Sequence, residues 1–263
     1  MMLRDKVAVV YGAGGGIGGA VANAFAREGA RVFLTGRDLS SVEIVAKEID
    51  SAGASAEAAQ VDALDEEAID AHLEHVMDDT GRLDISFNAV GIPNENIVGV
   101  PLTDLGVEPF LLAVESYTRS YFLTARLAAR RMVPNGSGVI MTVTATHARE
   151  GIPLVGGYGP AQAAKEALTR DLSAELAPNG IRVVGLRPQG MPETRTIRDA
   201  FEPRAEASGM TWEQWQEMLA SRTHPKRLMT LEEMANVAAF MASDRASGIT
   251  GTTVNLTMGR VDD

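Results

Sequence analysis

The chain has 263 residues, 45% of them hydrophobic, which is enough to bury the core of one doubly wound α/β domain. It contains no cysteine, which excludes disulfides, thiolate nucleophiles and cysteine-ligated zinc. The formal net charge of −11 argues against nucleic-acid binding and gives no reason to invoke an anionic membrane. Residues 1–6 show no signal-peptide pattern, so we expect a cytoplasmic protein.

Apolar runs of strand length alternate with segments of helical spacing along the whole chain. The predicted strands are Val7–Tyr11, Arg31–Thr35, Ala56–Asp62, Ile85–Ala89, Gly138–Val143, Arg182–Arg187 and Thr252–Leu256. The predicted helices are Ile17–Glu28, Leu39–Ala52, Glu66–Thr80, Ser116–Met132, Tyr158–Ala177 and Leu231–Ala242. This alternation predicts a doubly wound parallel sheet with helices on both faces, in a single three-layer α/β/α domain over residues 1–263.

Residues 191–225 depart from this alternation. They follow a predicted strand but are long, charged and rich in Met, Trp and Pro, with Trp212, Trp215 and Leu219 spaced along one face of a short helix. A long excursion after the carboxyl end of a strand is commonly a substrate loop or lid. The alternative is that both tryptophans only anchor this helix to the core.

A glycine-rich turn follows the first predicted strand and opens the first predicted helix. It comprises Gly12, Gly14, Gly15, Gly16, Ile17 and Gly18, and its glycines at 12, 16 and 18 have the spacing GxxxGxG. Glycine permits the tight turn and the close approach of backbone to a pyrophosphate, and a helix N-terminus offers free N–H groups. The turn therefore predicts a dinucleotide-binding site.

The spacing of this turn and the order of later landmarks resemble the short-chain dehydrogenase/reductase family over nearly the whole chain. The landmarks are Asp62-Ala63 after the third strand, Asn88 to Gly91, Tyr158, the Arg187-Pro188-Gln189-Gly190 turn, residues 227–235, and Ile249-Thr250-Gly251. The resemblance implies a Rossmann-type fold whose cofactor contacts include Asp62, Ala63, Asn88, Gly91 and Pro188. It also implies a small-molecule substrate and a homo-oligomer, a tetramer or a dimer, paired through the helices Ser116–Met132 and Tyr158–Ala177.

The end of the second strand bears on the choice of nicotinamide cofactor. NAD-using members of the family carry an acid near position 36, whereas this chain has Gly36 followed by Arg37. A guanidinium suits a 2′-phosphate through its charge and forked donors, so we expect NADP rather than NAD. The alternative is that Arg37 is a solvated charge paired with Asp38.

The positions of the family's catalytic residues are where this sequence departs from the family pattern. The family uses a tyrosine as general acid/base, a lysine four residues later that lowers its pKa, a serine on the substrate oxygen and a relay asparagine. A gapless count puts Tyr158, Gln162, Ala145 and Tyr117 at these four positions, so only the tyrosine is kept. Without a nearby cation, a tyrosine with a pKa near 10 is a poor base at neutral pH.

Two nearby residues are candidate substitutes. Lys165 lies seven residues after Tyr158, within about 20° of the same helix face; the alternative is a surface lysine beside Glu166. His147 shares strand parity with Ala145 and could present an imidazole, unless it is a surface residue. The candidate catalytic positions are therefore Tyr158, Gln162, Lys165 and His147, and the four histidines form no evident metal-ligand set.

By the same parity, Thr144 and Thr146 should point away from the site unless the strand has ended before them. The leading expectation is an NADP-dependent oxidoreductase with a remodelled site and a hydrophobic carbonyl or alcohol substrate. The alternatives are non-redox chemistry of the aldol or isomerase type, ligand binding without turnover, and a structural subunit that pairs with an active homologue.

Overall fold

Seven parallel strands form one sheet in the order β3-β2-β1-β4-β5-β6-β7 in the computed structural model of the chain. The model describes residues 1–93, 98–194, 198–199, 201–202, 205–206 and 209–262. The strands are β1 (Val7–Tyr11), β2 (Arg31–Gly36), β3 (Ala56–Gln60), β4 (Ile85–Asn88), β5 (Gly138–Val143), β6 (Ile181–Pro188) and β7 (Thr252–Leu256). The strand order reverses between β1 and β4, and such a switch point opens a crevice at the carboxyl ends of the strands.

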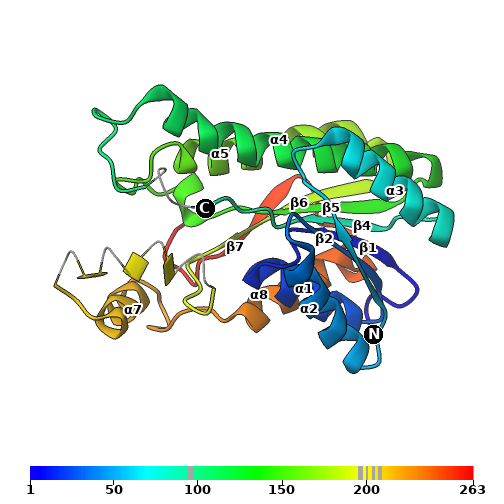
Figure 1. The fold of residues 1–263 in the computed structure, drawn as a ribbon, viewed down its shortest axis with the longest axis horizontal. Coiled ribbons are helices and arrows are strands. Elements are labelled where there is room, and N and C mark those ends of the chain that lie inside the picture. The colour runs from blue at the N-terminus through cyan, green and yellow to red at the C-terminus, as the bar shows by residue number, and fades with distance from the viewer. Residues whose placement is uncertain (94–97, 195–197, 200, 203–204, 207–208, 263) are drawn as a thin grey trace.

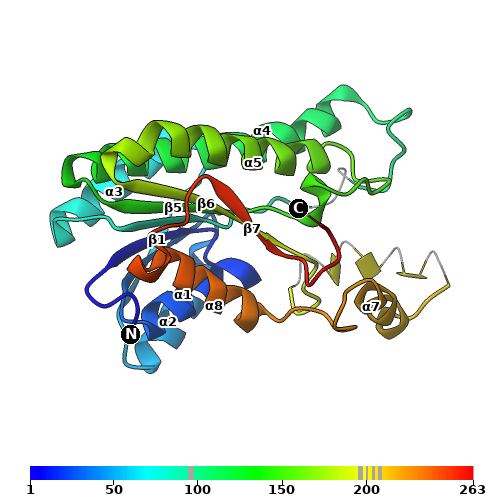
Figure 2. The same cartoon turned by 180° about the vertical axis from the view of Figure 1, so that it is seen from behind.

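Helices cover both faces of the sheet. They are α1 (Gly16–Arg27), α2 (Leu39–Ser51), α3 (Glu66–Thr80), α4 (Val107–Met132), α5 (Tyr158–Leu176) and α8 (Leu231–Ala242), whereas α7 (Trp212–Ser221) lies apart from the sheet. Figures 1 and 2 show α3, α4 and α5 on one face and α1, α2 and α8 on the other. The doubly wound, three-layer prediction is confirmed.

The strands are hydrophobic on both sides because both faces are covered. Val10 and Leu34 face the apolar cluster that includes α1, α2 and α8 residues. Val9 and Phe33, one position earlier in each strand, face the opposite cluster. Alternate residues of a strand point to opposite faces, so a strand buried on both faces is apolar throughout.

The ends of the predicted elements agree with the structure to within two residues, except at α4. This helix begins at Val107 rather than Ser116. Its N-cap is Gly106, and Glu108 and Pro109 fall in its first turn. A first-turn N–H has no partner within the helix, so Pro109 costs no hydrogen bond there and does not mark a helix boundary.

The segment that broke the alternation contains the predicted short helix, α7. Thr211 caps it, and Gln214 completes a capping box by bonding back to the Thr211 backbone. Figures 1 and 2 place α7 outside the three layers, beyond the carboxyl ends of β5 and β6. No helix in the described ranges is long and apolar enough to cross a membrane.

Candidate active site

The glycine-rich turn is a backbone cradle with no room for side chains. Gly12 has φ +76°, and a Cβ on it would lie 2.8 Å from the carbonyl oxygen of Ala89. A Cβ on Gly18 would overlap the carbonyl oxygen of Gly12, and one on Gly14 would overlap the Ser41 side chain. The turn can therefore only be built with glycine at these positions.

The cradle ends at the N-terminus of α1. Gly15 is the N-cap and provides no side-chain cap, and the first helical hydrogen bond joins Gly19 N to Gly15 O at 2.8 Å. The N–H groups of Gly16, Ile17 and Gly18 thus have no partner within the helix and lie at the positive end of its dipole. This geometry fits the diphosphate of a dinucleotide.

Arg37 is exposed beyond the end of β2. The Asp38 carboxylate caps α2 instead, accepting from Ser40 N at 3.1 Å and Ser40 Oγ at 2.7 Å. Among the described residues no ion pair joins Arg37 to Asp38, so the suggested pairing of the two is wrong. Arg37 is thus a solvated charge directly after Gly36.

The remaining predicted cofactor positions lie at the same edge of the sheet. Asp62 follows β3 and accepts from Leu64 N at 3.0 Å, with Ala63 buried beside it. Asn88 ends β4, where its side chain donates to Thr124 Oγ1 at 3.1 Å and accepts from Val90 N at 3.3 Å. Gly91 follows this turn, and Pro188 is the last residue of β6.

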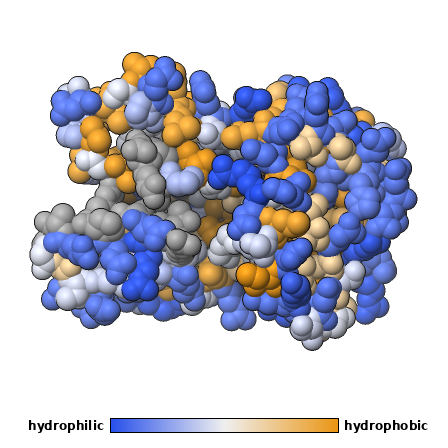
Figure 3. Space-filling model, in the orientation of Figure 1, coloured by the Kyte–Doolittle hydropathy of each residue, from blue (hydrophilic) through white to orange (hydrophobic). Residues whose placement is uncertain are grey.

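A cavity of about 430 Å³ lies between this edge and α7. Its walls are mostly apolar, and in Figure 3 hydrophobic residues border the hollow on the left of the view, between the end that carries α4 and the end that carries α7. The lining residues are Ile17, Thr144, Ala145, Thr146, His147, Ile152, Pro153, Leu154, Tyr158, Pro188, Gln189, Gly190, Met191, Phe201, Trp215, Met218, Leu219, Arg222 and Arg260.

Tyr158, the first residue of α5, lies in the wall of this cavity among aromatic rings. Its ring packs edge-to-face on His147, with centroids 5.0 Å apart, and on Tyr117, 5.4 Å apart. Burial raises the pKa of Tyr158, and the neighbouring Tyr117 hydroxyl raises it further. Tyr158 is therefore held protonated at neutral pH.

The segment after β5 contributes four consecutive residues to the cavity. Because β5 ends at Val143, strand alternation stops there, and Thr144, Ala145, Thr146 and His147 all line the wall. The strand has therefore ended before both threonines, which is the condition under which they were expected to reach the site, although the Thr144 hydroxyl itself donates to Glu166. His147 lies in a short 3₁₀ turn against Tyr158 and is not a simple surface residue.

Lys165 is 2% exposed, so the alternative that it is a surface lysine is wrong. Its Nζ donates to the carbonyl oxygen of Val143 at 2.5 Å and lies 5.7 Å and 5.9 Å from the ring centres of Tyr117 and Tyr121. Burial lowers its pKa to about 7. Among the described residues it forms no hydrogen bond with Tyr158; it supports the end of β5 instead.

Gln162 and Tyr117, at the family's lysine and asparagine positions, supply no cation to Tyr158. Gln162 is buried one helical turn after Tyr158, where the resemblance places a lysine. Tyr117, at the asparagine position, accepts from Ile92 N at 3.4 Å, a long and weak hydrogen bond. The structure thus brings Tyr158, His147 and Tyr117 together, whereas Lys165 Nζ is bound to the carbonyl oxygen of Val143.

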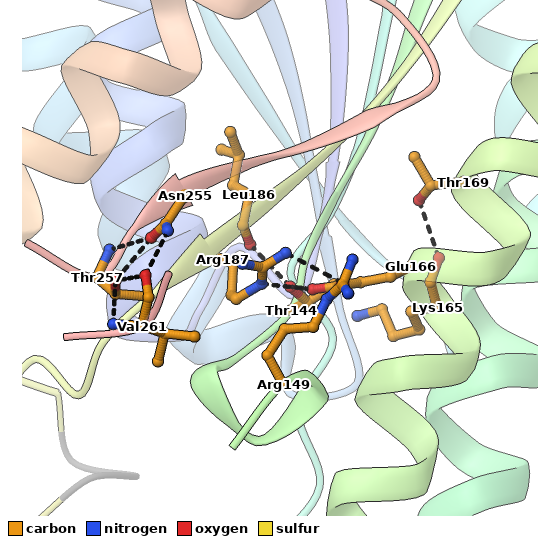
Figure 4. A network of polar contacts seen from close by, with 10 residues as sticks. All are labelled: Thr144, Arg149, Lys165, Glu166, Thr169, Leu186, Arg187, Asn255, Thr257 and Val261. Carbon is orange, nitrogen blue, oxygen red and sulfur yellow. Dashed lines mark hydrogen bonds and ion pairs between the residues drawn. The ribbon is translucent and has the colours of Figure 1, made fainter. Parts of the chain in front are cut away.

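A buried ion cluster below the cavity was not predicted from the sequence. The Glu166 carboxylate accepts hydrogen bonds from Arg187, at 2.7 Å and 3.2 Å, and from Arg149, at 3.2 Å (Figure 4). Thr144 Oγ1 also donates to this carboxylate, at 3.2 Å. Glu166 and Arg187 are 3% and 1% exposed. The available signal was Arg187 within an apolar strand, because a buried guanidinium requires a carboxylate partner.

The comparisons with known proteins agree with this architecture. A family model described as enoyl-(acyl carrier protein) reductase matches residues 12–260. The 7alpha-hydroxysteroid dehydrogenase of Escherichia coli (strain K12) is 30% identical over 263 residues, which cover 100% of this chain and 97% of that protein.

Two solved structures extend the likeness to three dimensions. A variant of actinorhodin polyketide ketoreductase with NADPH superposes with a TM-score of 0.89 at 26% identity, covering 97% of each chain. NAD⁺-bound xylitol dehydrogenase gives a TM-score of 0.89 at 26% identity, covering 97% of this chain and 98% of that one. The chain therefore belongs to the short-chain dehydrogenase/reductase family, a family of oxidoreductases with the Rossmann-type fold.

Proposed function

We propose that the protein is an NADP(H)-dependent oxidoreductase that interconverts a carbonyl and an alcohol on a small hydrophobic substrate. The observation that carries this proposal is the position of Tyr158. It shares one apolar cavity with Ile17, from the dinucleotide cradle, and with Pro188 and Met191, at the end of β6 and beyond it. A carbonyl in this cavity can meet the hydroxyl of Tyr158 and the cofactor at once.

The side chains at the cavity wall favour reduction over oxidation. A bound NADPH would supply the hydride to the carbonyl carbon, and Tyr158 donates its proton to the carbonyl oxygen. With its pKa raised by burial, Tyr158 is protonated and ready to act as an acid. His147 lies against Tyr158 and is placed to orient the substrate oxygen. The lid predicted over residues 191–225 extends over residues outside the described ones; of its described part, Met191 and α7 line the cavity and belong to the substrate lid in this proposal.

The choice of NADP rests on the end of β2. Gly36 offers no carboxylate to a ribose 2′-hydroxyl, and a Cβ there would lie 2.8 Å from Val42 Cγ2. Arg37 is exposed and, among the described residues, has no anionic partner. Structural neighbours include an NADPH complex and an NAD⁺ complex, so the fold accommodates either cofactor.

One observation favours a second candidate, a non-redox role such as an aldol-type or isomerase step, or ligand binding alone. Within the part of the chain that the structure describes, no cation contacts the Tyr158 hydroxyl. Gln162 and Ala145 occupy the positions of the family's lysine and serine. The cradle of glycines fits both candidates, because each retains the cofactor.

Single-turnover oxidation of NADPH separates the two candidates. We expect enzyme preloaded with NADPH to oxidise it when mixed with hydrophobic ketones, and Tyr158→Phe to slow this step by about 100-fold or more. Tyr11→Phe is the matched control, because the buried Tyr11 hydroxyl has no hydrogen-bond partner among the described residues. Tight NADPH binding with no oxidation by any carbonyl would favour the non-redox role instead.

We also propose a homo-oligomer, a tetramer or a dimer, paired through α4 and α5. The two helices lie side by side on one outer face in both views, and Phe122 on α4 is 43% exposed. Light scattering at micromolar concentration should give at least twice the chain mass of 27.9 kDa. A monomer would contradict this proposal.

A further inference from the structure

The charged side chains that line the cavity are basic, although the protein as a whole is acidic. The chain carries a formal net charge of −11, yet the charged side chains among the described lining residues are Arg222 and Arg260, with no Asp or Glu. This choice of basic side chains in the wall of an apolar cavity is not explained by the overall charge. It indicates that the ligand itself contributes negative charge.

Arg260 is the more buried of the two arginines. Its side chain is 9% exposed, and it pairs with Glu150 at 2.9 Å. Its Nε, however, is buried without a hydrogen-bond partner among the described residues. Glu150 therefore neutralises the charge of Arg260 but leaves one of its donors unused.

Arg222 has no such partner. It is the C-cap residue of α7 and is exposed, and within the described residues its side chain makes no ion pair or hydrogen bond. A cation at a helix C-terminus is favourable by itself. That effect does not require the residue to lie in the cavity wall, next to Leu219 and Met218 on the same helix.

A third donor lies on the same helix. The indole Nε1 of Trp215 is buried and unpartnered among the described residues, on a side chain that lines the cavity. Buried donors in native proteins are nearly always satisfied, and those of a binding site are commonly satisfied by the ligand. Trp215 Nε1 and Arg260 Nε are thus buried donors without a partner among the described residues, beside the exposed guanidinium of Arg222.

We propose that the cavity takes an apolar molecule that ends in a carboxylate, with Arg222 as the ion-pair partner of that group and the apolar part held against Leu219 and Met218. The exposed position of Arg222 suits an amphipathic ligand, whose charged end stays near water while its chain is buried. This inference rests on the proposed function only in assigning the ligand as the substrate; the preference for a carboxylate is a binding property and needs no turnover.

The test compares decanoate with methyl decanoate, which has the same chain without the charge. Binding is followed by intrinsic fluorescence, since both tryptophans of the chain lie in α7, and by calorimetry, with and without NADP⁺. We expect decanoate to bind at least about tenfold more tightly than the ester. Arg222→Gln should abolish this preference and leave the affinity for the ester unchanged, whereas Arg222→Lys should retain part of it.

Arg245→Gln is the control, because Arg245 is an exposed arginine in another segment that does not line the cavity. It should leave the preference intact. Equal binding of decanoate and its ester, or a preference that survives Arg222→Gln, would overturn the proposal. So would tighter binding of decyl phosphate than of decanoate, which would assign a phosphate site. Absence of NADPH oxidation with an intact preference for decanoate would instead refute only the proposed redox function.

Discussion

Two regions at the carboxyl edge of the sheet differ in what constrains their residues. After β1, Gly12 and Gly18 are placed so that neither could carry a Cβ without meeting backbone atoms. After β5 and at the start of α5, Ala145 and Gln162 hold side chains that the family resemblance does not lead one to expect. Backbone geometry fixes the residues of the first region, whereas the second region is defined by its side chains. Only the side chains of the second region can be substituted without a change in the backbone fold.

Two basic side chains lie near the second region, but they bind groups other than the Tyr158 hydroxyl. Lys165 donates to the carbonyl of Val143 at the end of β5, and Arg187 is bound to Glu166. Neither cation stabilises a tyrosinate at Tyr158, whose pKa is raised by burial. The difference between the regions is therefore one of chemistry: the cofactor cradle follows the family pattern, whereas the acid/base apparatus favours the protonated tyrosine.

The largest expected effect comes from the buried ion cluster. Glu166→Gln keeps the shape of the side chain but removes the buried carboxylate that binds Arg187 and Arg149, which should lower the free energy of unfolding by about 3–5 kcal/mol. Urea unfolding measures this, with Glu175→Gln, an exposed position on the same helix, as the control. A loss below about 1 kcal/mol would show that the cluster is not a structural element of the second region.

Substitution in the glycine cradle should lower stability almost as much, and the size of the loss should depend on which glycine is replaced. Gly18→Ala places a methyl group against the carbonyl oxygen of Gly12 and should cost about 1–3 kcal/mol of stability together with most of the NADPH affinity. Gly15→Ala is the matched control for stability, since its Cβ would lie 3.4 Å from the nearest atom outside its chain neighbours. Equal unfolding temperatures for the two variants would refute the steric account.

Burial of Lys165 predicts a pH dependence of stability. The folded state lowers its pKa to about 7, so between about pH 7 and the ordinary lysine pKa the unfolded chain binds more protons than the folded one. The contribution of Lys165 to stability therefore rises with pH, by about 2 kcal/mol from pH 7 to 9. Lys165→Met should remove this rise; parallel stability curves for the two proteins over this range would contradict it.

The smallest effect concerns cofactor choice. Arg37→Ala should reduce NADPH affinity by about tenfold and leave NADH affinity unchanged, because only the 2′-phosphate is contacted. Calorimetry with both cofactors measures the ratio, and Arg245→Ala serves as a remote control. Equal affinities for the two cofactors in the wild type, unaffected by Arg37→Ala, would remove the basis for assigning NADP.

The sequence predicted the fold better than the site, for identifiable physical reasons. Apolar periodicity and glycines act locally, so the strands and the cradle could be read directly from the chain. The adjacent charges Lys165 and Glu166 suggested a surface, and their burial becomes evident only from Arg187 and the carbonyl of Val143, which are distant in sequence. Likewise, the predicted strand has the bounds of β5, and Thr144 to His147 line the cavity because strand alternation stops at Val143.

The central claim is that Tyr158 works without a neighbouring cation and is therefore a proton donor that gives only weak reductase activity. Single-turnover NADPH oxidation by a hydrophobic ketone tests it most directly, comparing wild type with the double variant Gln162→Lys and Ala145→Ser. Restoring the lysine and the serine should raise the rate by at least about tenfold and should allow alcohol oxidation near pH 7. A wild-type rate already as high as that of the double variant, or a double variant with NADPH bound and no gain in either direction, would contradict the claim.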